Sequence, residues 1–194
     1  MATEFLHIAK PTLTIFTPAF NRAHTLHLCY ESLQRQTCRD FKWLVIDDGS
    51  VDGTRELVEN WIAQGNIPIH YHYQQNQGMH GAHNTAYTLI DTELNVCIDS
   101  DDYLADNAVE LIVEKWSHEG SDKYAGLIGL DARFEGTVIG TQFTSATTTL
   151  TDFYMHGGKG DKKLVYRTSV IKSVPEYPMF EGEKYVGLGY KYQL

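Results

Sequence analysis

In "VCIDSDDYLADNA", residues 96–108, an apolar run ends in three carboxylates, Asp99, Asp101 and Asp102. Three acids so close together repel one another, and folding gains nothing from that repulsion unless a positive charge lies beside them. A basic neighbour, the N-terminus of a helix or a divalent metal ion could supply this charge. The sequence on either side shows which kind of element the acids follow.

Runs typical of strands alternate with runs typical of helices around this stretch. The strands are predicted at residues 12–20, 41–50, 67–76 and 95–98. The helices are predicted at residues 22–36, from the cap Asp52 to Gly65, at 81–90 and at 106–116. Four strand–helix repeats are typical of an α/β fold, in which helices cover both faces of a largely parallel sheet.

Each predicted strand runs into a polar or acidic cluster. In chain order these clusters are "TPAFNR", "DDGS", "QNQGMHG" and "DSDD". Sheets of this kind bind ligands in the crevice beyond the carboxyl ends of their strands. The four strand ends therefore predict one shared binding crevice, which solvation of a surface alone does not explain.

The pattern changes after Gly120. Residues 123–143 are rich in β-formers, residues 144–163 are polar and predict a mobile loop, residues 164–174 are regular, and the tail has no helical period. A soft boundary near residue 120 divides one domain into two halves, 1–120 and 121–194.

Composition and charge restrict the class of protein. The chain has 194 residues and a formal net charge of -9, which argues against non-specific nucleic-acid binding. No window approaches the ~18 apolar residues of a transmembrane segment, and the first residues lack the pattern of a signal peptide. Three cysteines, Cys29, Cys38 and Cys97, have no metal or redox spacing and predict a reduced, cytoplasmic protein. Attachment to the inner membrane face through a partner stays open.

The strand-end motifs gain meaning together. Alone, "DDGS" is explained equally well by a helix cap with a tight turn and by a ligand site. Taken in order, "TIFTPAFNR", "FKWLVIDDGSVDGT", "QNQGMHGAHNTAY" and "VCIDSDDYLADNAV" resemble the nucleotide-binding half of family 2 glycosyltransferases with the GT-A fold. The resemblance covers residues 11–118 well and the remainder less strongly. It implies a Rossmann-like sheet, a nucleotide-sugar-binding half at 1–120 and a smaller, incomplete acceptor-side half at 121–194.

The resemblance assigns the nucleoside end of the site. Thr17, Pro18 and Phe20 look like the first-strand loop that packs on the nucleoside base. Asp48, together with Asp47, looks like the acidic pair that fixes that base.

The resemblance also assigns the diphosphate and sugar. "NQGMHGAHN" is similar to the family segment Asn-x-Gly-x-x-x-Ala-x-Asn, which implies roles for Gly78, His80 and Asn84. The family often has a basic residue here, where this chain offers His80 and His83.

"DSDD" looks like the metal motif of the family, in which Mn²⁺ or Mg²⁺ is shared with the donor diphosphate. Asp101 and Asp102 are the implied metal-side residues, and Asp99 and Asp101 are implied to contact the nucleotide sugar. Such ions prefer oxygen ligands and are held by one or two carboxylates plus substrate phosphates. An acidic helix N-terminus capped by Asp106 is the structural alternative.

The later half is expected to supply the general base. Within "MFEGEKYVG", Glu183 is the first candidate and Glu181 the second, against the alternative of two solvated loop glutamates. "DKKLVYR" could bring a cation near phosphate through Lys163 or Arg167, although basic surface residues are common.

The predicted function is inverting transfer of a sugar from a nucleotide-sugar donor, UDP-linked by preference, to a carbohydrate or lipid-linked acceptor in cell-surface polysaccharide synthesis. The sequence stops at Leu194, where family members usually continue, so either this is a fragment, or a partner or a second copy in a homo-oligomer completes the acceptor side. Two alternatives are a sugar-phosphate nucleotidyltransferase and a nucleotide-sugar-binding module without turnover.

Overall fold

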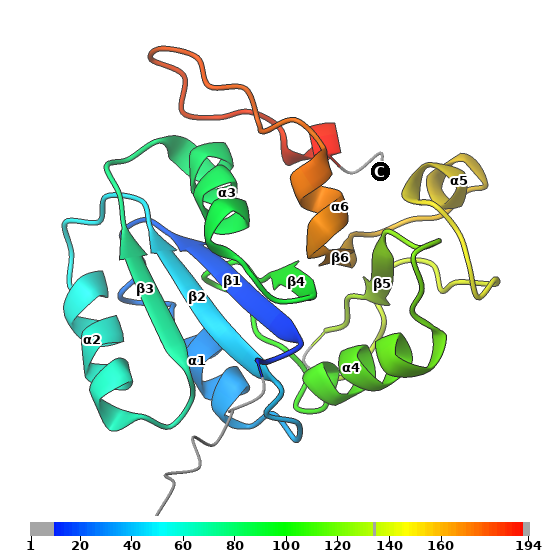
Figure 1. Cartoon of the computed structure of the whole chain (residues 1–194), viewed down its shortest axis with the longest axis horizontal. Coiled ribbons are helices and arrows are strands. Elements are labelled where there is room, and N and C mark those ends of the chain that lie inside the picture. Colours follow the sequence, from blue (N-terminus) through cyan, green and yellow to red (C-terminus); the bar gives the residue numbers. More distant parts are fainter. Residues whose placement is uncertain (1–9, 134, 192–194) are drawn as a thin grey trace, which may run out of the picture.

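One six-stranded sheet, in the order β3-β2-β1-β4-β6-β5, organises the computed structural model, which describes residues 10–133 and 135–191 apart from the side chain of residue 190 (Figure 1). The strands are β1 (Leu13–Ala19), β2 (Phe41–Asp47), β3 (Ile69–Tyr73), β4 (Leu94–Cys97), β5 (Gly126–Leu130) and β6 (Lys162–Arg167). The first four strands pair in parallel, whereas β6 runs antiparallel to both of its neighbours. The predicted largely parallel sheet is present, with one reversed strand in its second half.

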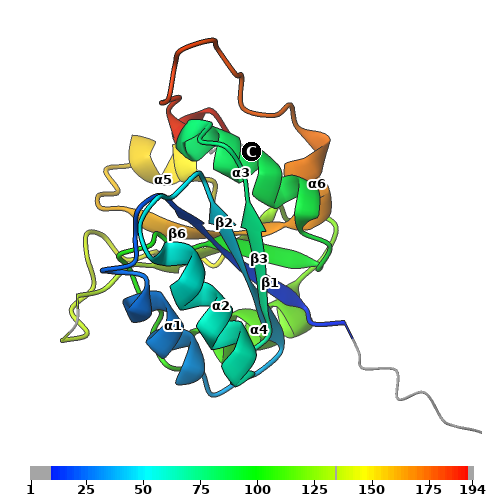
Figure 2. The same ribbon diagram turned by 90° about the vertical axis from the view of Figure 1, so that its left-hand side faces the viewer.

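Helices cover both faces of the sheet. They are α1 (His27–Gln34), α2 (Thr54–Gln64), α3 (Gly78–Leu89), α4 (Ala108–Glu119), the short α5 (Leu150–Met155) and α6 (Thr168–Ser173), followed by the 3₁₀ turn η1 (Leu188–Lys191). Figure 2 shows α1, α2 and α4 on one side of the sheet and α3 and α6 on the other. No helix among the described residues is long and apolar enough to cross a membrane.

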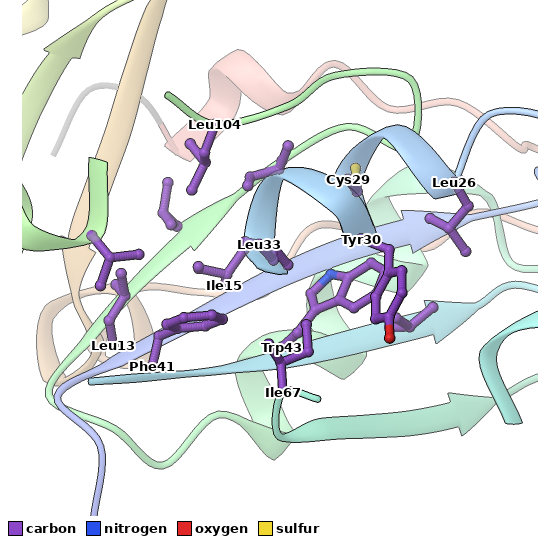
Figure 3. Packing of buried hydrophobic residues seen from close by; sticks show 14 of the residues in the cluster. Leu13, Ile15, Leu26, Cys29, Tyr30, Leu33, Phe41, Trp43, Ile67 and Leu104 are labelled. Carbon is purple, nitrogen blue, oxygen red and sulfur yellow. The ribbon is translucent and has the colours of Figure 1, made fainter. Parts of the chain in front are cut away.

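Strand β2 is apolar almost throughout because both of its faces are buried. Trp43 points toward α1 and α2, where Tyr30 and Trp61 stack with a ring separation of 4.2 Å (Figure 3). Leu44 and Ile46 point the other way, against α3. The alternation along one strand therefore supplies the cores of both layers.

Several predicted boundaries need correction. The helix expected at 22–36 begins only at His27, because Asn21 adopts a left-handed conformation with φ 56° and the next residues form turns. The helix expected after Asp52 begins at Thr54, whose backbone N–H donates to Asp52 Oδ1 at 3.0 Å, and ends before Gly65 as predicted.

The second half differs more from the prediction. The polar segment 144–163 is not loop throughout: it contains α5, which begins where the Thr149 hydroxyl accepts the Asp152 N–H at 3.0 Å, and the first residues of β6. The β-rich segment 123–143 contains β5 and a single bridge between Ala132 and Val138. The soft boundary near residue 120 stays a prediction, and β5 and β6 extend the sheet begun by the first half.

Among the aromatic rings between β1 and α3 lies His83, which is 3% exposed. Its Nδ1 lies 2.9 Å from the Met79 carbonyl oxygen, and its ring meets Phe16 edge-on at 5.2 Å. Burial lowers the pKa of His83 from 6.5 to about 4, and the nearby Lys191 and His80 add to this effect. The folded protein therefore holds His83 neutral.

Acid should destabilise the fold through His83. The unfolded chain binds a proton at His83 below pH 6.5 and the folded chain only near pH 4. The stabilisation is thus complete above pH 6.5 and is lost as the pH falls towards 4, by roughly 3 kcal/mol in total. Urea unfolding between pH 4 and 7.5 should show a flatter profile for His83→Gln. His118→Gln, at an exposed site of α4, is the matched control, and equal profiles for the two variants would contradict the assignment.

Candidate functional site

Loops after the first two strands are joined at the crevice predicted by the sequence. The Asn21 backbone N–H donates to Ser50 Oγ at 2.9 Å, and Asn21 Oδ1 accepts the Val51 N–H at 2.9 Å. At the next strand end, the Ile98 N–H donates to the Phe16 carbonyl at 2.9 Å. These bonds bring the carboxyl ends of β1, β2 and β4 to one edge of the sheet.

The acidic loop after β4, residues 99–104, is anchored on α1. The Cys29 thiol lies 3.1 Å from the carbonyl oxygen of Asp99 and 3.0 Å from that of Asp102. Burial raises the pKa of Cys29 to about 12, so the thiol is a neutral donor. Ser32 Oγ accepts the Leu104 N–H at 3.2 Å. Two side chains of α1 therefore hold the backbone of the loop.

The carboxylates of this loop face outward. Asp99, Asp101 and Asp102 are all exposed, and within residues 10–133 and 135–191 their side-chain oxygens accept no hydrogen bond. Two cations approach the loop: Arg22 Nε donates to Ser100 Oγ at 3.0 Å, and Nζ of Lys163, on β6, lies 3.9 Å from Asp102 Oδ2. Partial burial raises the pKa of Asp102, and Lys163 opposes that rise. A basic neighbour thus supplies part of the charge that the acids require.

A small open pocket of about 120 Å³ lies beside the loop and is lined by residues of β1, α3, β4 and β6 that include Asp99, His83, Lys162 and Lys163. A larger hollow of about 240 Å³ lies over β2 and β3 and contains none of the predicted site residues. The smaller pocket, and not the larger one, is lined by a predicted site residue, Asp99.

The acidic loop suits a metal ion only if the substrate supplies some of the ligands. The described part of the chain contains no group of three or more His, Cys, Asp or Glu side chains arranged to hold an ion. Asp101 and Asp102 nevertheless offer exposed oxygens without hydrogen bonds, which suits an ion held by one or two carboxylates and by substrate phosphates.

In contrast, the acids after β2 point inward. Asp48 is 3% exposed, and its carboxylate accepts the Gln77 N–H at 2.8 Å, the Gly78 N–H at 2.8 Å and the Gln74 side-chain amide at 2.7 Å. Asp47 is fully buried, accepts the Ser50 N–H at 2.8 Å and accepts the Tyr71 hydroxyl. Both carboxylates hold the fold together, and their contact with a nucleoside base stays a prediction.

Residues predicted at the start of α3 hold the C-terminal tail. Gly78 has φ 80°, and a Cβ there would lie 2.1 Å from the Lys184 carbonyl oxygen. The Asn84 side-chain amide donates to the Tyr177 carbonyl and accepts the Tyr177 N–H, both at 2.9 Å. His80 is fully buried, and neither of its ring nitrogens has a hydrogen-bond partner among the described residues.

The predicted site residues at the end of β1 also differ in how exposed they are. Thr17 is fully buried and accepts the Trp43 indole N–H at 2.9 Å, and Pro18 is half-buried. Phe20 is 47% exposed. Phe20 is therefore the member of this group whose ring is open to a planar ligand.

Glu181 and Glu183 are exposed in the tail segment that runs past α3 (Figure 1). Glu183 Oε1 accepts the N–H groups of Lys184 and Tyr185, each at 3.0 Å. The Lys184 ammonium donates to the Asn76 carbonyl, which places this segment at the junction of β3 and α3. The segment thus contacts the end of β3, whereas the acidic loop follows β4, and β2 and β1 lie between these strands in the sheet.

The two cations predicted near phosphate have different partners in the structure. Arg167 pairs with Asp122, whereas Lys163 faces the acidic loop. Asp131, after β5, was not predicted as a neighbour of the site, yet Lys163 opposes the rise in its pKa that burial causes. No sequence motif marks Asp131, because only the pairing of β5 with β6 brings it there.

Known structures share this fold. S. aureus TarS 1-349 in complex with UDP-GlcNAc matches with a TM-score of 0.67 and 20% identity, over 84% of this chain and 47% of that one. The mannosyltransferase PcManGT from Pyrobaculum calidifontis, in complex with GDP-Man and Mn²⁺, matches with a TM-score of 0.62 and 17% identity, over 88% and 48%. The predicted fold class is confirmed.

The chain belongs to glycosyl transferase family 2, whose sequence model matches residues 14–154. It is 35% identical over 107 residues to a chondroitin synthase of Escherichia coli, which is 55% of this chain and 15% of that protein. It is 32% identical over 121 residues to the GalNAc(5)-diNAcBac-PP-undecaprenol beta-1,3-glucosyltransferase of Campylobacter jejuni, which is 61% of this chain and 38% of that enzyme. The chain thus spans a minor part of both relatives.

Asp48 should contribute far more to stability than the exposed acids. Asp48→Asn replaces an acceptor of two backbone N–H groups by an amide that cannot accept both, which should cost roughly 1–3 kcal/mol of unfolding free energy. Asp101→Asn is the matched control and should change stability by less than about 0.5 kcal/mol. Urea denaturation at pH 7 measures both values. Equal losses in the two variants would show that the three hydrogen bonds at Asp48 contribute little.

Proposed function

We propose that this chain binds a nucleotide-sugar donor, UDP-linked by preference, and takes part in inverting transfer of the sugar to a carbohydrate or lipid-linked acceptor of a cell-surface polysaccharide. The observation that carries the proposal is the acidic loop, whose three carboxylates are exposed and accept no hydrogen bond among the described residues. Family membership supports the reaction class and disfavours the nucleotidyltransferase alternative.

The donor proposal draws on the neighbouring structures and on the crevice. TarS was crystallised with UDP and with UDP-GlcNAc, and both complexes match this chain. Here the exposed ring of Phe20 is available to a nucleoside base at the end of β1. The pocket beside Asp99 is available to the diphosphate and sugar.

Asp101 and Asp102 would hold Mn²⁺ or Mg²⁺ together with the donor phosphates. Such an ion would neutralise the charge that develops on the departing nucleoside diphosphate. The loop supports this role, because Cys29 and Ser32 hold the backbone from which the carboxylates extend.

Glu183 is the proposed general base. It would accept the proton of the acceptor hydroxyl while that oxygen bonds to the anomeric carbon and the bond to the diphosphate breaks. Phe180 and Tyr185 flank the glutamates and are 60% and 69% exposed, which suits contact with the apolar face of a sugar. Glu181, two residues away and also exposed, is the alternative base.

Donor binding should depend on a divalent ion. With UDP at ~100 times its dissociation constant, the stabilisation with Mn²⁺ should reach roughly 2.7 kcal/mol and should nearly vanish with EDTA. Asp102→Asn should lose most of the Mn²⁺-dependent part and reduce transfer at least ~100-fold. Thermal melting with UDP and GDP, each with and without Mn²⁺, measures the first effect. If neither nucleotide shifts the melting temperature in any buffer, the proposed donor site is wrong.

Glu183→Gln should separate donor binding from transfer. We expect unchanged affinity for UDP-GlcNAc with Mn²⁺ and a loss of transfer of roughly 100- to 10,000-fold, since a base acts on the acceptor. Glu181→Gln is the matched control. If Glu181→Gln is the inactive variant, the segment is right and the residue is wrong. If the unaltered protein binds the donor but transfers to no acceptor, this chain is a donor-binding module.

A further inference from the structure

Lys163 forms an ion pair with the acidic loop, which Arg22 also contacts through a hydrogen bond from its Nε to Ser100 Oγ at 3.0 Å. Lys163 lies on β6, which pairs with β4 immediately before the three aspartates, and it also lines the pocket of about 120 Å³ beside Asp99. Its Nζ lies 3.9 Å from Asp102 Oδ2. No other Lys or Arg of the described chain forms an ion pair with this loop.

Strand alternation explains why this lysine reaches the loop and its neighbours do not. Side chains of successive residues leave a strand in opposite directions, so Lys162 and Lys163 reach different partners, although both line the pocket. Lys162 lies over the Phe153 ring at 5.0 Å and donates to the Lys159 and Gly160 carbonyls. Arg167 shares the face of Lys163 but lies four residues away, about 13 Å along the strand.

The N–H donors of the Lys163 ammonium are not used by other described residues. Within the described residues it makes no hydrogen bond, and its side chain is 27% exposed. A separation of 3.9 Å between partly exposed groups is a loose ion pair, which contributes little to stability. The three N–H donors of the ammonium are therefore available to another acceptor.

Charge balance indicates what that acceptor is. Asp99 lines the pocket, and Asp101 and Asp102 follow it in the same exposed loop. A diphosphate that enters this region meets an excess of negative charge. A divalent ion between carboxylates and phosphates would offset part of the repulsion. The positive charge of Lys163, which lines the same pocket, would offset more.

We propose that Lys163 is a diphosphate ligand of the donor site: it balances Asp102 in the free protein and turns to the phosphate oxygens when the donor binds. The inference rests on the proposed function. In the transfer step the bond between the anomeric carbon and the diphosphate oxygen breaks, and the ammonium donates hydrogen bonds to the charge left on the phosphates. Its proton stays on Nζ, so the residue acts electrostatically.

A purely structural role of Lys163 predicts a different effect of its loss on ligand affinity. If Lys163 only ties β6 to the acidic loop, its loss weakens every ligand of the crevice equally or affects none. If it binds phosphate, its loss weakens ligands in proportion to their phosphates. Comparison of UDP with uridine separates the two cases, because both carry the same base and ribose.

The test is calorimetric titration of the whole chain with UDP in Mn²⁺, together with displacement of UDP by uridine. Lys163→Met keeps the apolar stem and should weaken UDP by roughly 10- to 100-fold while uridine is unchanged. Lys115→Met, at an exposed site of α4 where the lysine pairs with Glu119, is the matched control and should change neither. Lys163→Arg should keep most of the UDP affinity, because it retains the charge.

Three outcomes overturn the inference: equal weakening of UDP and uridine by Lys163→Met, no weakening of UDP, or the same loss in Lys115→Met. Thermal melting shows whether each variant is folded, and Lys163→Gln gives the same comparison if the Met variant is not. Failure of the unaltered protein to bind UDP or GDP would instead refute the proposed function and this inference with it. Binding of UDP with normal affinity by Lys163→Met would refute the inference alone.

Discussion

The buried carboxylate of Asp48 connects the parts of the donor half. It follows β2, accepts the backbone N–H groups of Gln77 and Gly78 at the start of α3, and accepts the side chain of Gln74 after β3. A negative charge at this position also favours the N-terminus of the helix. Because α3 in turn binds the tail through Gly78 and Asn84, a single buried acid fixes the edge of the crevice and the segment that carries Glu183.

The acidic loop is built on the opposite plan. Its backbone is held by Cys29 and Ser32 of α1, so the charged groups themselves stay free of internal hydrogen bonds among the described residues. Carboxylates whose oxygens already accept hydrogen bonds, such as those of Asp47 and Asp48, support the fold around the site. Exposed carboxylates whose oxygens accept none are available to a ligand. This division is the reason why we propose a donor role for the loop after β4 and for Lys163 rather than for Asp47 and Asp48.

Hydrophobic periodicity predicted the strand–helix order and the sheet, since a parallel sheet covered on both faces requires apolar strands and amphipathic helices. It also predicted the crevice, because polar clusters at four strand ends must meet at one edge. It failed for α5 and for the start of α1. There a Thr149 cap and the left-handed Asn21 decide the local conformation, and neither alters the apolar pattern.

The sequence by itself therefore determined the α/β class, the family resemblance and the acids that end β4. Only the tertiary structure decided which of the acids are free. Asp48 and Asp102 look alike in the chain, yet one is buried under three donors and the other is exposed beside a cation. The choice of Lys163 over Arg167 depends on which residue of β6 lies beside the end of β4. Such pairings join residues more than sixty positions apart, and local propensity carries no information about contacts at that range.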